Sequence, residues 1–221
     1  MTGFARVVFA VAFKDLRVEF RSREMLPALA QFAVLALLIA NFGFDLTGDA
    51  GRIAPGVLWL AVVFVGLIAF GRAFAGERDQ GSLEALLLTP ASRAAIFAGK
   101  ALAAALILAA CEAVLVPAMG LFFGTPVLDG TLIATLLLST VGMAALGCLF
   151  GALAAQTRAR DLLLPVLALP LWLPLIVYGG RAIQVAMGAA GGYSDALGRL
   201  LALDILFIVV AALAAHVVLN D

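Results

Sequence analysis

Residues 76–90 read Gly-Glu-Arg-Asp-Gln-Gly-Ser-Leu-Glu-Ala-Leu-Leu-Leu-Thr-Pro, and this polar stretch separates two long apolar runs at about 55–75 and 94–123. A helix needs roughly 20 residues to cross the hydrocarbon core of a bilayer, and each run is long enough. Four more apolar runs of at least 19 residues occur at about 26–44, 131–155, 162–180 and 200–219. Six membrane-spanning helices are therefore predicted, and residues 76–90 join the second to the third.

The overall composition is that of an integral membrane protein. Of the 221 residues, 65% are hydrophobic and 13% are charged, whereas soluble domains are about half apolar and a quarter charged. The runs are too long and too uniformly apolar for the strands of an outer-membrane barrel, which alternate in polarity over roughly ten residues. The expected fold is therefore all-α, a bundle of six transmembrane helices.

The N-terminal residues predict a helix that lies in the membrane interface without crossing it. Phe9, Phe13, Leu16 and Phe20 recur at helical spacing, and Lys and Arg residues occupy the polar positions between them. This pattern is typical of interfacial amphipathic helices. We therefore expect two parts: a retained amphipathic helix over residues 1–25 and a six-helix transmembrane domain over residues 26–219.

The distribution of charge predicts the orientation of the helices. The chain has 14 basic and 14 acidic residues and no net charge, so it offers no basic field for nucleic acid. With the N-terminus inside, eleven Lys and Arg residues fall in inner segments, and only Arg52, Arg181 and Arg199 fall in outer ones. Basic residues concentrate on the cytoplasmic side of membrane proteins. Both termini and the 76–100 connection are therefore predicted to be cytoplasmic.

Turn and capping residues bound the stretch 76–90 on both sides. Asp79 or Ser82 could cap a short helix at its N-terminus. Thr89 and Pro90 are typical of the N-cap and the first residue of the next helix, the third crossing. The connection is therefore predicted to be ordered and helical.

The leucines of this stretch suggest what it contacts. A solvated loop that only orients the protein through its arginines is the simpler interpretation. However, Leu83, Leu86 and Leu87 would share one helix face that has no evident membrane partner. An amphipathic helix with such a face is suited to docking a cytoplasmic subunit, which is the interpretation we favour.

No motif indicates catalysis or a metal site. The pair Gly99-Lys100 lacks the following Ser or Thr and the preceding Gly of an ATP-binding phosphate loop. The single histidine, His216, is expected to be an interfacial polar residue, with haem or metal ligation as the alternative. No catalytic residue or metal ligand is therefore assigned, and any ATP must be bound by another chain.

Two carboxylates lie within apolar runs. Glu112 stands halfway along the third run, where a charge costs about 2.5–3.5 kcal/mol on insertion scales and indicates a functional residue by default. It could line a pathway or a partner interface; alternatively, it is protonated or paired inside the bundle and only fixes helix packing. Asp204, near the start of the sixth run, is expected to reach the membrane interface.

The fifth run contains Pro165, Pro170 and Pro174. Each proline removes a backbone donor and crowds the preceding turn, so a kinked or partly broken helix is expected. Residues 182–187, beyond this run, could form a separate short interfacial or re-entrant helix.

Several segments, in this order, carry a resemblance to a known family: residues 14–21 (Lys-Asp-Leu-Arg-Val-Glu-Phe-Arg), residues 52–59 (Arg-Ile-Ala-Pro-Gly-Val-Leu-Trp), residues 81–90, the pair Gly99-Lys100 and the proline-rich fifth run. Over about residues 6–180 the chain resembles ABC-2 type transporter permeases, and among these the CcmB family of haem-exporter permease subunits.

The resemblance implies a subunit without enzymatic activity in the bacterial inner membrane. It would form a dimer with a second copy of itself and couple ATP hydrolysis by a separate CcmA-like ATPase to haem export, or to release of a haem-loaded CcmE-like periplasmic chaperone, during cytochrome c maturation. Haem-handling membrane proteins similar to CcmC and CcmD would be further partners, beside membrane lipids. Haem would be a transported or handled ligand and not a cofactor of this chain alone, since no axial haem ligand carries over.

The family's ATPase-docking role carries over to a coupling loop at residues 76–100. Arg17 and Arg21 of the N-terminal helix would be a possible second docking contact. The coupling-helix residues that match the family pattern are Glu77, Gly81, Ser82, Leu83, Glu84, Leu86, Leu87 and Pro90.

Two other functions fit the same chain. One is an ABC-2 type permease for a lipid-linked glycan or a drug; residues 52–59 favour the haem system over this function. The other is a membrane scaffold that holds partner subunits and transports nothing; Glu112 and the prolines of the fifth run favour a moving permease over a scaffold.

Overall fold

A computed structural model describes residues 2–22, 25–43, 50–79, 92–124, 129–155, 157, 160–187 and 191–218. Within these residues the chain is helical and contains no strand. The helices are α1 (Thr2–Ser22), α2 (Met25–Gly43), α3 (Ala50–Asp79), α5 (Arg93–Phe123), α6 (Gly130–Ala155), α7 (Arg160–Ala186) and α8 (Tyr193–Val218).

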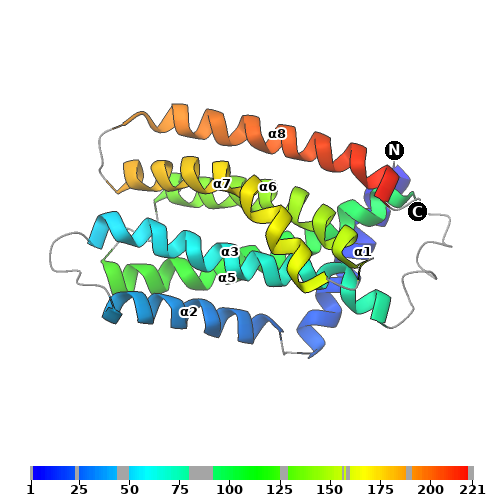
Figure 1. Ribbon diagram of the computed structural model, residues 1–221, viewed down its shortest axis with the longest axis horizontal. Helices are drawn as coiled ribbons and strands as arrows, with labels where there is room; N and C mark the ends of the chain where they lie inside the picture. Colours follow the sequence, from blue (N-terminus) through cyan, green and yellow to red (C-terminus); the bar gives the residue numbers. More distant parts are fainter. Residues whose placement is uncertain are drawn as a thin grey trace.

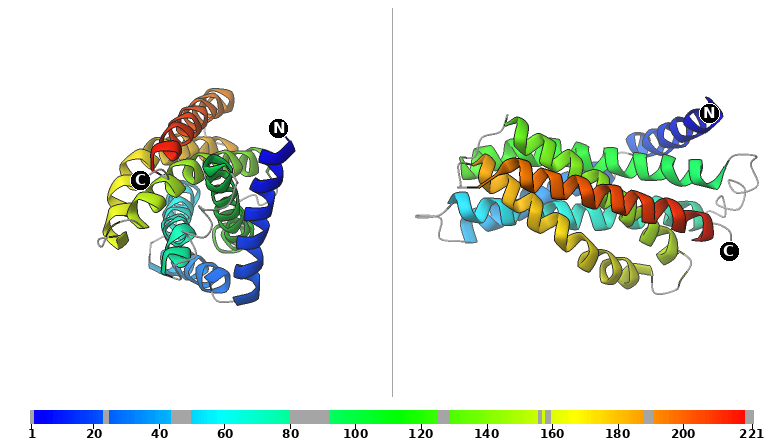
Figure 2. Two further views of the ribbon diagram at one scale, coloured as in Figure 1. Left: turned by 90° about the vertical axis from the view of Figure 1, so that its right-hand side faces the viewer. Right: turned by 90° about the horizontal axis from the view of Figure 1, so that it is seen from above.

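Six of these helices, α2, α3 and α5 to α8, are long and apolar enough to cross a membrane. They run along the long axis of the molecule, whereas α1 lies across one end of the bundle (Figures 1 and 2). Many large apolar side chains stay exposed on the bundle, as expected of surfaces that face lipid. The predicted all-α fold, with six transmembrane helices after an amphipathic helix, is confirmed.

Helix α6 forms the centre of the bundle because small residues let its neighbours approach closely. A Cβ atom added at Gly151 would lie 2.5 Å from the backbone oxygen of Phe70 in α3, and one at Gly147 would lie 2.5 Å from the Phe70 ring. The same ring meets Trp172 of α7 edge-on, with centroids 5.7 Å apart. Glycines on α6 thus bring α3 and α7 onto one side of it.

Helix α7 is continuous in spite of its prolines. It runs through Pro165, Pro170 and Pro174 and on to Ala186, so the partial break is not present and residues 182–186 do not form a separate helix. Figure 1 shows that α7 changes direction along its length, which agrees with the expected kink. Prolines are tolerated in such a helix when packing against neighbouring helices offsets the lost backbone bonds.

The boundaries of the connection between α3 and α5 also differ from the prediction. Helix α3 continues to Asp79, so Gly76 does not end it and Asp79 is not the cap of a new helix. Helix α5 begins at Arg93, and the Ser92 hydroxyl accepts a hydrogen bond from the Ala95 amide as its N-cap. The predicted start at Thr89 and Pro90 is therefore wrong for the helix of the third crossing.

At the end of the bundle opposite α1, Asp129 caps α6. Its carboxylate accepts hydrogen bonds from the Thr131 hydroxyl, from the Thr131 amide at 2.6 Å and from the Leu132 amide at 3.2 Å. The bonds from Thr131 hold the pKa of Asp129 below its usual range. The Tyr193 hydroxyl donates to the Thr131 carbonyl at 2.9 Å, which ties the start of α8 to the start of α6.

Candidate functional site

Most of the predicted coupling helix lies outside the described residues. This holds for Gly81, Ser82, Leu83, Glu84, Leu86, Leu87 and Pro90; Glu77 belongs to the last turn of α3, and its side chain is likewise outside the described part. The structure does describe the two helices that lead into and out of this segment. Their anchoring therefore defines the candidate site.

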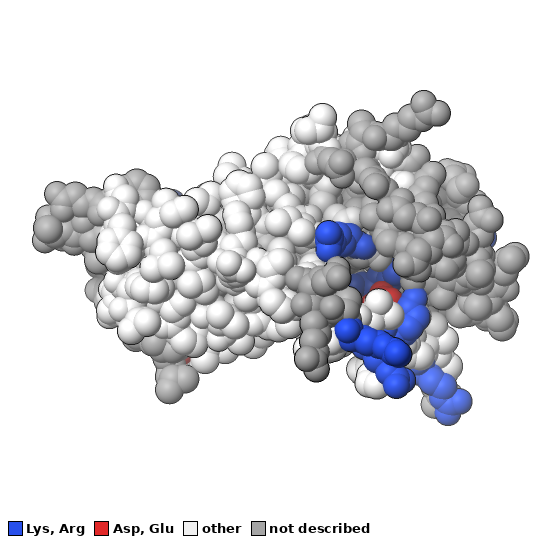
Figure 3. All heavy atoms as spheres, turned by 90° about the horizontal axis from the view of Figure 1, so that it is seen from below, with Lys and Arg blue, Asp and Glu red and all other residues white. Residues whose placement is uncertain are grey.

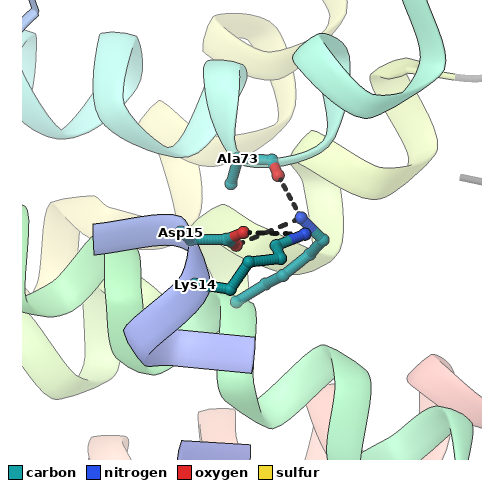
Figure 4. Close-up of polar contacts among 4 residues, drawn as sticks. Lys14, Asp15 and Ala73 are labelled. Atoms are coloured by element: carbon teal, nitrogen blue, oxygen red, sulfur yellow. Dashed lines mark hydrogen bonds and ion pairs between the residues drawn. The ribbon is translucent and has the colours of Figure 1, made fainter. Parts of the chain in front are cut away.

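Lys100 of α5 is the central residue of this anchoring. Its side chain is 1% exposed and makes an ion pair with Asp15 of α1, with 3.2 Å between Nζ and Oδ2. Its ammonium group also donates to the Ala73 carbonyl of α3 at 2.9 Å and lies 5.2 Å from the centre of the Phe74 ring. Figure 4 shows the carboxylate of Asp15, from α1, and the carbonyl of Ala73, from α3, facing the same ammonium group. We call this set, Asp15, Ala73, Phe74 and Lys100, the lysine junction.

Gly99 explains why α1 can come close enough for the ion pair to form. A Cβ atom at this position would lie 2.7 Å from the Val11 Cβ atom and 2.8 Å from the Val8 carbonyl oxygen. Any side chain at position 99 would therefore push α1 away from α5. The pair Gly99-Lys100 thus combines a close helix contact with a buried ion pair in adjacent residues.

Asp15 also forms an ion pair with a second, more exposed lysine. The Lys14 ammonium lies 3.1 Å from Asp15 Oδ1, with the Lys14 side chain 47% exposed and that of Asp15 20% exposed. Exposed pairs of this kind contribute about 0–1 kcal/mol, whereas breaking a buried pair costs several times more. The pair between Lys100 and Asp15 therefore contributes more to stability than the pair between Lys14 and Asp15, and Lys100 is the residue that holds α1 in place.

A further contact holds the corner between α1 and α2. The Leu26 amide donates to Glu19 Oε1 at 3.1 Å, which satisfies a backbone donor in the first turn of α2. The rest of α1 presents exposed aromatic residues, including Phe9 and Phe13, and the exposed Arg17 and Arg21. Figure 3 shows Lys and Arg side chains gathered at the end of the molecule that α1 crosses.

Glu112 is buried between α5 and α6. Glu112 is 4% exposed, and its Oε1 atom accepts a hydrogen bond of 2.8 Å from the Thr140 hydroxyl. The carboxyl group is thus partnered inside the bundle, although a role in a pathway or moving interface stays a prediction. Among the described residues, no group of three or more His, Cys, Asp and Glu side chains is placed to hold a metal ion; the side chain of His216 lies outside them.

Asp204 does not reach the membrane interface, contrary to the expectation. It is 4% exposed and faces α6, where a Cβ atom at Gly142 would lie 2.2 Å from Asp204 Oδ1. The reason is that α8 starts at Tyr193, seven residues before the predicted start at 200. Asp204 is therefore eleven residues inside the helix, roughly 16 Å along its axis.

Sequence reasoning missed the lysine junction. It counted Lys100 only among the basic residues of the inner segments, but the structure buries this side chain almost completely. The available signal was a single lysine inside an apolar run, because an unpaired ammonium is rarely buried in such a position. The signal gives no partner, since Asp15 lies 85 residues away in the sequence.

The fold and the site define a multi-pass membrane protein: it has six apolar spans, an amphipathic helix across one end of the bundle and a polar connection between two anchored helices. Residues 6–220 match the family described as CcmB protein. The chain belongs to this family, and the resemblance seen in the sequence is confirmed.

Curated relatives share this similarity over most of their length. The chain is 32% identical over 207 residues to "Heme exporter protein B" from Paracoccus denitrificans, covering 93% of each chain. It is 29% identical over 198 residues to the protein of the same name from Rhodobacter capsulatus, covering 85% of this chain and 91% of the relative. The Escherichia coli protein of that name is 32% identical over 194 residues, with 85% and 87% covered.

Proposed function

We propose that this chain is the permease subunit of a haem exporter in cytochrome c maturation. It would couple ATP hydrolysis by a separate subunit to haem export or to release of a haem-loaded periplasmic chaperone. The observation that carries the proposal is the match of residues 6–220, nearly the whole chain, to a family whose curated members are named heme exporter proteins.

The positions of the described basic residues support an orientation with the α1 end in the cytoplasm. Basic residues concentrate on that side of a membrane. The bundle end opposite α1 carries Arg181 and Arg199, whereas the α1 end carries Arg6, Lys14, Arg17, Arg21, Arg72, Arg93 and Lys100. We infer an inner-membrane protein with both termini in the cytoplasm.

The same orientation gives the 76–100 connection a role in coupling. A CcmA-like ATPase would dock on the predicted coupling helix, through Glu77, Gly81, Ser82, Leu83, Glu84, Leu86, Leu87 and Pro90. Ala73 lies six residues before the end of α3, and Lys100 lies seven residues after the start of α5. The lysine junction therefore holds both ends of the docking segment against α1, whose Arg17 and Arg21 would give a second contact.

The chain would act with other subunits and without catalysis of its own. A second copy would complete the permease, CcmC-like and CcmD-like proteins would handle haem within the membrane, and a CcmE-like chaperone would receive it. ATP would be bound by the partner. An ABC-2 type permease for another substrate and a membrane scaffold without transport remain the alternatives.

Complementation tests the proposed function. In an Escherichia coli strain lacking its own heme exporter protein B, expression of this chain should restore c-type cytochromes, measured by haem staining of membrane proteins. Membrane insertion is followed in parallel with an antibody against the chain. A well-inserted chain that restores no c-type cytochrome, while the Paracoccus denitrificans relative does, would contradict the proposal.

The role of Glu112 can be separated from packing by Glu112→Gln. Gln keeps the size of the side chain and can still accept the hydrogen bond from Thr140. We propose that Glu112 lines a moving interface, and we therefore expect a loss of at least about fivefold in cytochrome c yield with an unchanged melting temperature. Thr140→Val, which removes the donor alone, is the matched variant. An unchanged yield in Glu112→Gln would assign Glu112 to helix packing.

A further inference from the structure

Asp204 is a buried carboxyl group to which the described residues offer no hydrogen-bond partner. Both of its side-chain oxygens are inaccessible and unpartnered. This differs from Glu112, which accepts a bond from Thr140. An isolated carboxylate in an apolar environment is very unfavourable, whereas its neutral acid form costs far less.

The neighbours of Asp204 come from α6 and α7. A Cβ atom added at Gly142 would lie 2.2 Å from Asp204 Oδ1 and 3.1 Å from Leu175 Cδ1 of α7, so the carboxyl group rests on the backbone of α6 beside an apolar side chain. Ser139 lies one turn from Gly142 on the same face of α6, and its hydroxyl is also buried without a partner. We call Ser139, Gly142, Leu175 and Asp204 the α8 seam.

Among the described side chains, no cation faces the α8 seam from the helices around it. The described part of α6 contains no charged residue, and the charged residues of α7 lie near the two ends of that helix. On α8 itself, Arg199 pairs with Asp195 at 2.9 Å and lies over the Tyr178 ring. On α5, Arg93 is at the helix start, Lys100 belongs to the lysine junction, and Glu112 meets α6 at Thr140.

Glu112 and Asp204 approach α6 from opposite sides at nearly the same depth. Their contacts, Thr140 and Gly142, are two residues apart, which is roughly 3 Å along the axis and 200° around it. Both lie near the middle of α6 (Gly130–Ala155). The described part of the bundle thus carries two separate acidic positions at mid-membrane; Glu112 accepts a hydrogen bond from a protein donor there, and Asp204 has none among the described residues.

We propose that the α8 seam is a proton-binding site in which Asp204 holds the proton as a carboxylic acid. A bound metal cation fits less well, because hard cations take several oxygen ligands and the seam offers one carboxyl and one hydroxyl group. Opening the seam to water would let the acid ionise, and closing it would require a proton to return. Separation of α8 from α6 is therefore linked to the exchange of one proton, whatever the permease transports.

Infrared spectroscopy of the whole protein in lipid tests this site. At neutral pH, the spectrum of the native protein minus that of Asp204→Asn should contain the C=O stretch of a protonated carboxyl group, and this band should move to lower frequency in deuterated water. Asn has nearly the shape of the neutral acid, so the seam should stay packed. The matched control Glu112→Gln should leave the Asp204 band in place.

Two results would overturn the proposal. In the first, the Asp204→Asn spectrum lacks a carboxylate band of the native protein and keeps all of its acid bands. The other is replacement of the acid band by a carboxylate band when sodium or potassium is added at constant pH, which would make the seam a metal-cation site. If Asp204→Asn does not insert, Asp204→Glu decides the question. A protonated side chain at this position should then give an acid band at a shifted frequency, whereas an ionised side chain should give no acid band.

Discussion

Lys100→Met should lower the free energy of unfolding by about 2–3 kcal/mol and remove most of the c-type cytochrome yield. The Lys100 ammonium lies 3.2 Å from the Asp15 carboxylate and 2.9 Å from the Ala73 carbonyl oxygen. Met has a similar length and apolar stem but cannot donate a hydrogen bond to either group. The loss lies below that of a fully buried ion pair because Asp15 is 20% exposed and keeps Lys14. Thermal melting in detergent measures the loss of stability, hydrogen exchange of the α1 amides measures the loss of anchoring, and haem staining of membrane proteins measures the cytochrome yield.

Lys14→Gln is the matched control for this experiment. Lys14 lies on the same carboxylate at 3.1 Å, but its side chain is 47% exposed, and such pairs contribute about 0–1 kcal/mol. We therefore expect little change in melting and no faster exchange in α1. Equal effects of the two substitutions would show that burial of Lys100 does not anchor α1, and the lysine junction would lose its proposed role.

The fold was predictable because hydropathy and length alone decide it. Six runs of sufficient length require six helices, since no other open structure satisfies backbone groups in lipid. Helix ends were less predictable, because local signals compete there. Gly76 and the charges after it suggested a turn, yet α3 continues to Asp79. Thr89 was the predicted N-cap of the next helix, whereas Ser92 caps α5.

The polar contacts inside the bundle were beyond sequence reasoning for a different reason. Each joins residues far apart in the chain: Lys100 with Asp15, and Glu112 with Thr140. Helical periodicity assigns a residue to a face but not to a neighbour. Asp204 shows a second cause, because an error of seven residues in the start of α8 moved a mid-membrane carboxyl group to the predicted interface.

The double variant Leu86→Asp/Leu87→Asp should weaken binding of the partner ATPase by at least about 100-fold, so that it no longer co-purifies in mild detergent. Burial of each leucine would contribute about 1.5–3 kcal/mol, and a loss of 2.8 kcal/mol is a factor of about 100 in affinity. Glu84→Lys, which reverses the charge beside this face, should also reduce the amount of ATPase recovered.

Ala85→Asp separates docking from the mere addition of charge to residues 76–90. Position 85 would lie about 200° from Leu83 around a helix, away from the face that Leu83, Leu86 and Leu87 share. The same acidic side chain at this position should therefore leave ATPase recovery nearly unchanged. Because the lysine junction anchors α3 and α5 independently of these side chains, all variants should melt like the native protein. Undiminished recovery with Leu86→Asp/Leu87→Asp would refute docking through this helix, and equal losses in all variants would refute a leucine-specific contact.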